Sequence, residues 1–195
     1  RWGFNVNRAS SSDYVRDFHL TTGLSGDPNI LFSQFYVEGF GEGAYARLDS
    51  RVYQGLNSII VNSQLPVVLP RFTYSYMGRP DALGGRLSLD TTNFNVIRTD
   101  GTNTRRASLT LNWERPFVGR LGDLWKITLH GDAAGYNASQ FNNQPSYGDA
   151  TNMTGVHALP QMAVDFRWPF GRSSGAWGTQ LIEPIAQLII APQSG

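Results

Sequence analysis

The chain has 195 residues, enough for one sizeable domain, with 16 basic and 15 acidic residues. This near-neutral balance gives no electrostatic footprint for nucleic-acid binding, which usually needs a clustered basic patch, and the absence of cysteine excludes disulfides and thiolate metal sites. Charged residues make up only 16% of the chain, below the ~25% of ordinary soluble domains. Aromatic residues reach 12%, and the composition favours strands that meet lipid on one side and water on the other.

Alternation of apolar and polar residues predicts strands, because successive strand side chains point to opposite faces. Several segments exceed the ~5–6 residues of a typical soluble strand, and ten residues tilted by ~40° rise by ~25 Å, the height of an outer-membrane apolar band. We therefore predict an all-β fold, an antiparallel meander of about nine long strands forming one segment over residues 1–195. The expected strands are Arg1–Asn7, Ile30–Gly39, Ala44–Gly55, Pro66–Met77, Gly85–Arg98, Arg105–Pro116, Leu124–Asn137, His157–Phe170 and Thr179–Pro192.

Short and long connections roughly alternate, as in barrels with short periplasmic turns and long outer loops. The expected short connections are Gly41–Gly43, Gly78–Gly84, Val118–Asp123 and Gly171–Gly178; the long ones are Arg8–Asn29, Leu56–Leu65 and Ala138–Gly155. Thr99–Thr104 is short where a long loop is due. Residues 39–43 resemble a glycine-rich phosphate loop, but they lie between two strands with no helix after them, which favours a hairpin.

The prolines within the predicted strands lack the N–H that a ladder needs. They are Pro66, Pro70, Pro160, Pro169 and Pro184. They mark strand ends and bulges, or they weaken pairing so that a wide barrel bends.

Acidic and basic side chains share the polar strand faces, and no spacing selects a carboxylate pair for glycoside hydrolysis. The three histidines stand far apart, so we expect neither an enzyme nor a metal or other cofactor. A solvated, mixed-charge wall is the natural interpretation. Its lumen-facing candidates are Arg47, Asp49, Arg51, Arg71, Glu114, Asp165, Arg167 and Glu183.

Aromatic residues gather near the predicted strand ends, where a girdle at lipid headgroup level would hold them. The alternative is the buried core of a sandwich. The lipid-facing or girdle candidates are Tyr74, Tyr76, Leu109, Leu111, Trp113, Trp125 and Trp168, and Trp2 and Trp177 belong to the same pattern.

Several stretches resemble one family, the lipopolysaccharide-assembly outer-membrane proteins called LptD. The opening Trp2–Ser10, the middle stretches Val37–Phe40 and Leu65–Phe72, and the end of the chain carry the resemblance. The end is the most specific part. There a Leu-Pro-Gln stretch from Leu159 leads through Arg167–Phe170 to a Glu-Pro-x-x-Gln pattern at Glu183–Gln187.

The resemblance implies an arc of a very large barrel, of about 26 strands, in the outer membrane of a Gram-negative bacterium. It also implies the transfer of lipopolysaccharide into the outer leaflet, with an LptE-type lipoprotein plug inside the barrel. The family's N-terminal domain, which docks an LptA-type periplasmic bridge, its cysteines and its lateral-gate strands have no counterpart here, so we expect a central part of the barrel. An export signal is likewise not expected within these residues.

The arginines of the polar face then have three open roles: transient contact with lipopolysaccharide phosphates, pairing with Asp49 and Asp165, or contact with the plug. Membrane lipid is the expected partner of the opposite face. Two other functions stay open, a general outer-membrane porin and a secreted β-sandwich that binds carbohydrate.

Overall fold

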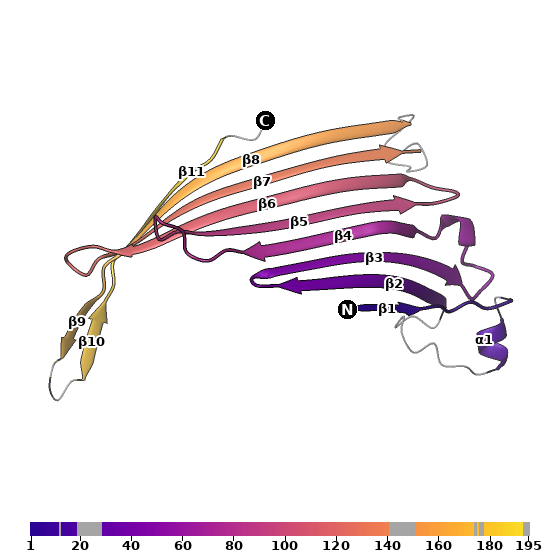
Figure 1. The fold of residues 1–195 in the computed structure, drawn as a ribbon, viewed down its shortest axis with the longest axis horizontal. Helices are drawn as coiled ribbons and strands as arrows, with labels where there is room; N and C mark the ends of the chain where they lie inside the picture. Colours follow the sequence, from indigo (N-terminus) through magenta and orange to yellow (C-terminus); the bar gives the residue numbers. More distant parts are fainter. Residues whose placement is uncertain (12, 19–28, 141–150, 174, 176–177, 193–195) are drawn as a thin grey trace. The chain divides into compact units, whose positions relative to one another are not determined.

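A computed structural model of the chain describes residues 1–11, 13–18, 29–140, 151–173, 175 and 178–192 (Figure 1). Strands dominate it, with one short helix, α1 (Tyr14–Asp17), and one 3-10 turn, η1 (Asn62–Gln64). No helix among the described residues has the length and apolar character needed to cross a membrane. The strands are Trp2–Asn5 (β1), Ile30–Gly41 (β2), Ala44–Gly55 (β3), Val67–Met77 (β4), Arg86–Ile97 (β5), Asn103–Val118 (β6), Leu124–Ser139 (β7), Asn152–Arg167 (β8), Phe170–Ser173 (β9), Thr179–Ile182 (β10) and Ile185–Ile190 (β11).

Nine of these strands form one sheet in the order β1-β2-β3-β4-β5-β6-β7-β8-β11. Each strand from β1 to β8 therefore pairs with its neighbour in sequence, and the predicted nine-stranded antiparallel meander is confirmed. The glycine-rich residues after β2 make the predicted hairpin, with Gly43 at φ 65° as the glycine that a tight turn requires. The compact connections after β4 and β6 are confirmed as well.

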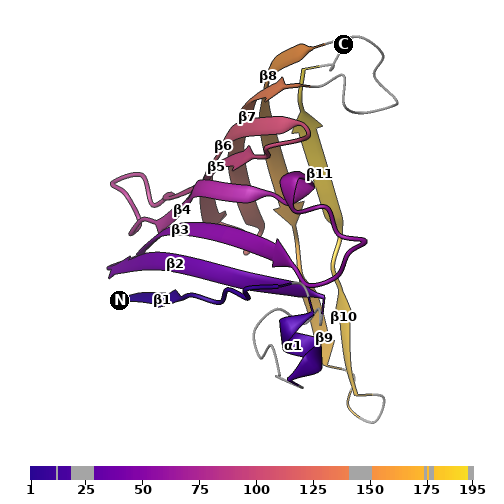
Figure 2. The same cartoon turned by 90° about the vertical axis from the view of Figure 1, so that its right-hand side faces the viewer.

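The end of the chain departs from the prediction. Thr179–Pro192 is two strands, because Pro184 cannot donate to a ladder and separates β10 from β11. The prediction of a short connection at Gly171–Gly178 is wrong, because β9 and β10 form a separate two-stranded hairpin there. The sheet strand before it runs over Asn152–Arg167 instead of His157–Phe170, so the preceding loop is shorter than expected. Figure 2 shows the hairpin running away from β8 and β11.

The first sheet strands show how alternation sorts the side chains. Opposite partners lie on the same face of an antiparallel pair, so the pair Glu38 and Arg47 belongs to a polar face. The pair Val37 and Leu48, one residue along, belongs to the opposite apolar face, where both side chains are more than 40% exposed. The strands are therefore two-faced.

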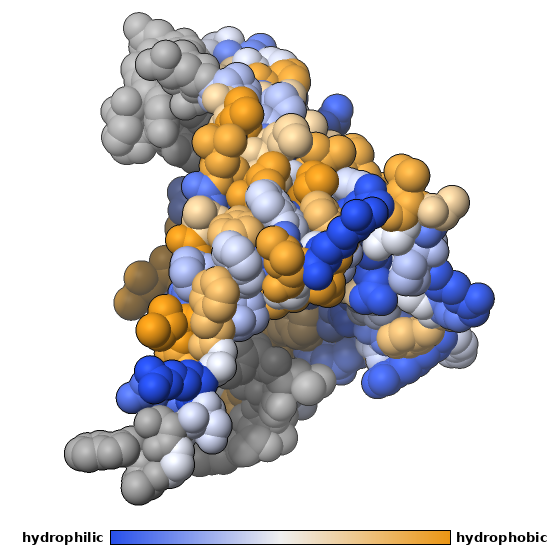
Figure 3. Space-filling model, turned by 90° about the vertical axis from the view of Figure 1, so that its left-hand side faces the viewer, coloured by the Kyte–Doolittle hydropathy of each residue, from blue (hydrophilic) through white to orange (hydrophobic). Residues whose placement is uncertain are grey.

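Apolar burial is scarce among the described residues. The buried hydrophobic side chains are Ala9, Leu31, Leu56, Ala134 and Ala138. Figure 3 shows large apolar patches open on the surface. A sandwich core of buried tryptophans does not fit this pattern, since Trp2, for example, is 67% exposed.

The chain divides into two compact units whose boundaries cut across the strands. The first contains Arg1–Ser75, Thr91–Ser108 and Ala134–Val156; the second contains Tyr76–Asp90, Leu109–Ala133 and His157–Gly195. The connections after β4 and β6 and the β9–β10 hairpin belong to the second unit.

Candidate functional site: charged groups and an aromatic row

A group of ion pairs occupies the polar face of β2, β3 and β4 in the first unit. Its centre is Asp49, whose side chain is fully buried. Arg51 Nε donates to Asp49 Oδ2 at 2.7 Å, and Arg71 Nε donates to Asp49 Oδ1 at 2.9 Å. Arg47 Nη1 donates to Glu38 Oε1 at 2.6 Å, and Arg47 Nε lies 3.4 Å from Asp49 Oδ1. We call these five residues the Asp49 cluster.

The Asp49 cluster combines buried carboxylates with partly open guanidinium groups. The Glu38 side chain is 10% exposed, whereas those of Arg47 and Arg71 are 23% and 34% exposed. Three guanidinium groups against two carboxylates leave one surplus positive charge within the cluster. Charge-assisted hydrogen bonds to an anion are therefore available on the open side without disturbing Asp49.

A second charged group, which belongs to the second unit, lies on β7, β8, β11 and the connection between β10 and β11. Lys126 Nζ lies 3.5 Å from Asp165 Oδ2, and Gln187 Nε2 donates to Asp165 Oδ1 at 2.6 Å. Arg167 Nε lies 3.6 Å from Glu183 Oε1. We call these five residues the Lys126 group.

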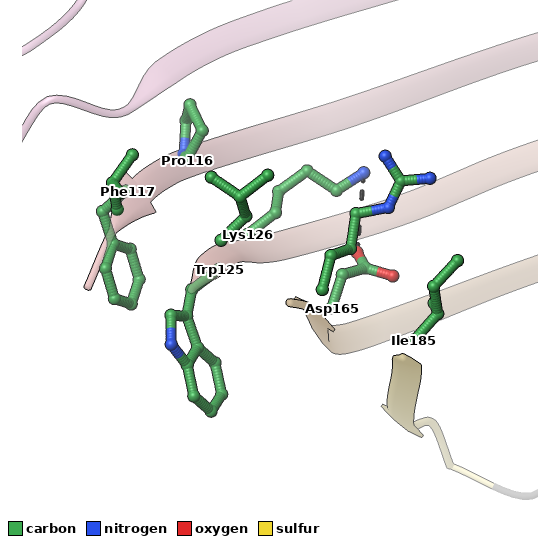
Figure 4. A pocket seen from close by; sticks show the side chains of 9 residues that line it. Pro116, Phe117, Trp125, Lys126, Asp165 and Ile185 are labelled. Atoms are coloured by element: carbon green, nitrogen blue, oxygen red, sulfur yellow. Dashed lines mark ion pairs between the residues drawn. The ribbon is translucent and has the colours of Figure 1, made fainter. Parts of the chain in front are cut away.

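The Lys126 group borders an open cavity of about 720 Å³ (Figure 4). Figure 4 shows the Lys126 side chain reaching toward Asp165, with Pro116 and Ile185 among the lining side chains. Most of the remaining lining is apolar. The full lining is Pro116, Phe117, Val118, Leu124, Trp125, Lys126, Asp165, Arg167 and Ile185. The site can therefore accept a ligand with both apolar and charged parts.

A third polar contact joins β6 and β7 and was not among the lumen-facing candidates predicted from the sequence. Thr110 Oγ1 donates to Asp132 Oδ1 at 2.6 Å, and His130 Nε2 lies 2.6 Å from Asp132 Oδ2. The spacing of two between His130 and Asp132 was the available signal, because it places both on one strand face. Glu114 stands apart from the two charged groups and accepts a hydrogen bond from Asn112 Nδ2 at 3.1 Å.

Five aromatic rings follow one another across β6, β7, β8 and β9. The ring centroids lie 6.2 Å apart for Phe117 and Trp125, 4.8 Å for Trp125 and Phe166, 6.3 Å for Phe166 and Trp168, and 4.7 Å for Trp168 and Phe170. We call this set the aromatic row. The two tryptophans were candidates from sequence, whereas the three phenylalanines were missed, since only strand register shows that they connect the tryptophans.

Two turns fix tryptophan side chains through an aspartate. Asp81, after β4, accepts the Trp113 indole N–H at 2.9 Å and the backbone N–H groups of Leu83 and Gly85. Asp123, before β7, accepts the Trp125 indole N–H at 2.5 Å. These hydrogen bonds, led by that of the indole in each case, lower the pKa of Asp81 and of Asp123 because they favour the ionised carboxylate.

The remaining candidates lie on β4 and β6. Tyr74, Tyr76 and Leu109 are half-buried, and Leu111 is 38% exposed. Trp177 lies outside the described residues. The described residues contain no group of three or more His, Cys, Asp or Glu side chains suited to a metal ion.

These features define the class of the protein: an all-β chain whose long, two-faced strands fit a transmembrane β-barrel. A family model described as LPS transport system D, LptD, matches residues 1–195. The chain therefore belongs to the LptD family, a family of lipopolysaccharide transport and outer-membrane assembly in Gram-negative bacteria. No curated protein matches the chain.

Proposed function

We propose that this chain forms an arc of an LptD-type outer-membrane barrel that inserts lipopolysaccharide into the outer leaflet. The polar face of the sheet lines the lumen, and the apolar face meets membrane lipid. The observation that carries this proposal is the contrast on β2 and β3, where ion-paired Glu38 and Arg47 alternate with exposed Val37 and Leu48. The family match supports the same assignment.

Strand length supports a membrane-spanning role. β2 and β3 have 12 residues each, and β6, β7 and β8 have 16 each. At ~3.3 Å per residue and a tilt of ~40°, strands of this length cross an apolar band of ~25 Å. The short turns would then lie on the periplasmic side.

The charged groups support passage of an amphipathic glycolipid. Its phosphorylated sugar head needs hydrogen-bond donors and water, which a mixed-charge wall supplies. Arg47, Arg51 and Arg71 offer transient contacts to phosphate, and their contacts to Asp49 and Glu38 keep them ordered. We assign no catalytic step to the chain. An LptE-type plug inside the lumen and an LptA-type bridge on the periplasmic side are the partners that this role requires.

Cell fractionation of the gene product with affinity purification tests the proposal. We expect it in the outer membrane together with a co-purifying lipoprotein. An outer-membrane location without any lipoprotein would favour a general porin. A soluble periplasmic protein would contradict the membrane assignment and favour a secreted carbohydrate-binding sandwich.

A further inference from the structure

The β9–β10 hairpin is a separate two-stranded sheet, and the membrane-spanning role proposed for the long strands does not explain it. It interrupts the sheet between β8 and β11, and prolines stand at both junctions, Pro169 before β9 and Pro184 after β10. The Trp168 backbone N–H donates to the Pro184 carbonyl at 3.0 Å, which closes the base of the hairpin. The hairpin is therefore a defined extension beyond the end of β8, and its first residue, Phe170, is the last ring of the aromatic row.

The two faces of the hairpin differ in character. Phe170 lies opposite Ile182, and the next pair outward on the same face is Arg172 and Gln180. The other face carries Leu181 opposite Gly171, where no side chain flanks the leucine across the pair. Phe170 is 46% exposed and Ile182 is 70% exposed. One face thus presents an exposed apolar pair followed by a cation.

The apolar pair is continuous with the apolar face of the sheet. The Phe170 ring contacts Trp168, from which the aromatic row leads through Phe166 to Trp125 on β7. Trp125 shares its strand face with Leu129, which is 45% exposed. The same surface therefore runs from the middle of β7 to the hairpin.

We propose that the Phe170–Ile182 face of the β9–β10 hairpin lies on the phospholipid surface at the turn end of the sheet. Phe170 and Ile182 enter the acyl boundary, and Arg172 meets a lipid phosphate. An apolar anchor beside a cation is the arrangement of interfacial membrane segments, in which long basic side chains reach the headgroups. This inference rests on the proposed lipid-facing orientation of the apolar face.

Site-specific photo-crosslinking tests the inference. The photoreactive residue p-benzoylphenylalanine is placed singly at Ile182, Leu181 or Leu129 of the gene product, which is reconstituted in vesicles of radiolabelled phosphatidylethanolamine and phosphatidylglycerol. Ile182 and Leu181 are neighbours of nearly equal exposure, 70% and 67%, on opposite hairpin faces, so Leu181 is the matched control. Labelling at Leu129, on the apolar face of β7, tests whether that face of the sheet meets lipid.

We expect lipid labelling at Ile182 several-fold above that at Leu181, with strong labelling at Leu129. Labelling at Leu129 with none at Ile182, or with equal labelling at Ile182 and Leu181, would overturn the hairpin inference and leave the proposed function standing. No labelling at Leu129 would overturn both. A protein adduct at Ile182 in place of lipid would assign the hairpin to a protein partner and likewise overturn the inference.

The role of Arg172 has its own test in the same assay. We expect Arg172→Glu to lower labelling at Ile182 several-fold in vesicles rich in anionic phosphatidylglycerol, whereas Arg172→Lys keeps it. Unchanged labelling with Arg172→Glu would contradict the phosphate contact.

Discussion

The Asp49 cluster and the Lys126 group are both mixed-charge networks on polar strand faces, yet they differ in burial. The Asp49 side chain is fully buried, and its oxygens contact three arginines. The Lys126 and Arg167 side chains are 45% and 54% exposed, and each contacts one carboxylate. The first network therefore chiefly holds neighbouring strands together, while the second leaves its charges open beside a cavity.

Removing the central carboxylate gives the largest expected effect. Asp49→Ala leaves three guanidinium groups close together without their shared anion. Breaking a buried pair from one side typically costs about 3–5 kcal/mol. We expect a loss of this size in the free energy of unfolding, measured by urea titration in detergent.

Asp165→Ala is the matched control, because the Asp165 side chain is 22% exposed and its ion pair with Lys126 is open. Exposed pairs contribute about 0–1 kcal/mol. Equal losses for Asp49→Ala and Asp165→Ala would remove the distinction between the two networks.

The two faces of β6 provide the next test. Arg in place of Leu111 puts a charge on the proposed lipid face, and such substitutions cost about 2–4 kcal/mol near the bilayer midplane. Thr110→Arg puts the charge on the opposite face beside Asp132 and should have little effect. The readout is the free energy of unfolding in lipid vesicles. Equal tolerance of Leu111→Arg and Thr110→Arg would refute the assigned orientation.

The smallest expected effect concerns the turn at Asp81. Its pKa is lowered by the Trp113 indole hydrogen bond and by backbone N–H groups, so the stabilisation is complete above the unfolded-state pKa and is lost as the pH falls through the folded-state value. We expect Trp113→Phe to raise the Asp81 pKa toward its usual range in an NMR titration. Asp81→Asn should remove the part of the loss of protein stability at low pH that comes from protonation of Asp81. An unchanged Asp81 pKa in Trp113→Phe would show that the indole bond is unimportant.

Sequence periodicity predicted the strands and the polar side of β3, because a period of two depends only on local chain geometry. The contact between Arg71 and Asp49 lies beyond such reasoning, since strand register brings together residues 22 positions apart. For the same reason, only the two tryptophans of the aromatic row could be predicted from the sequence, and the three phenylalanines could not. The β9–β10 hairpin was missed because its four-residue strands are too short for a period to stand out, although Pro169 and Pro184 already marked its base.

In the proposed function, one strand face meets lipopolysaccharide in a lumen and the other meets membrane lipid. Tyr45 and Ala46 are neighbours on β3 that lie on the polar and apolar faces, next to the short β2–β3 turn. With p-benzoylphenylalanine at each position in living cells, we expect Tyr45 to crosslink lipopolysaccharide only while transport is active, and Ala46 to crosslink phospholipid. The same adduct at both positions, or only phospholipid at Tyr45, would contradict the assignment of the polar face to the lumen.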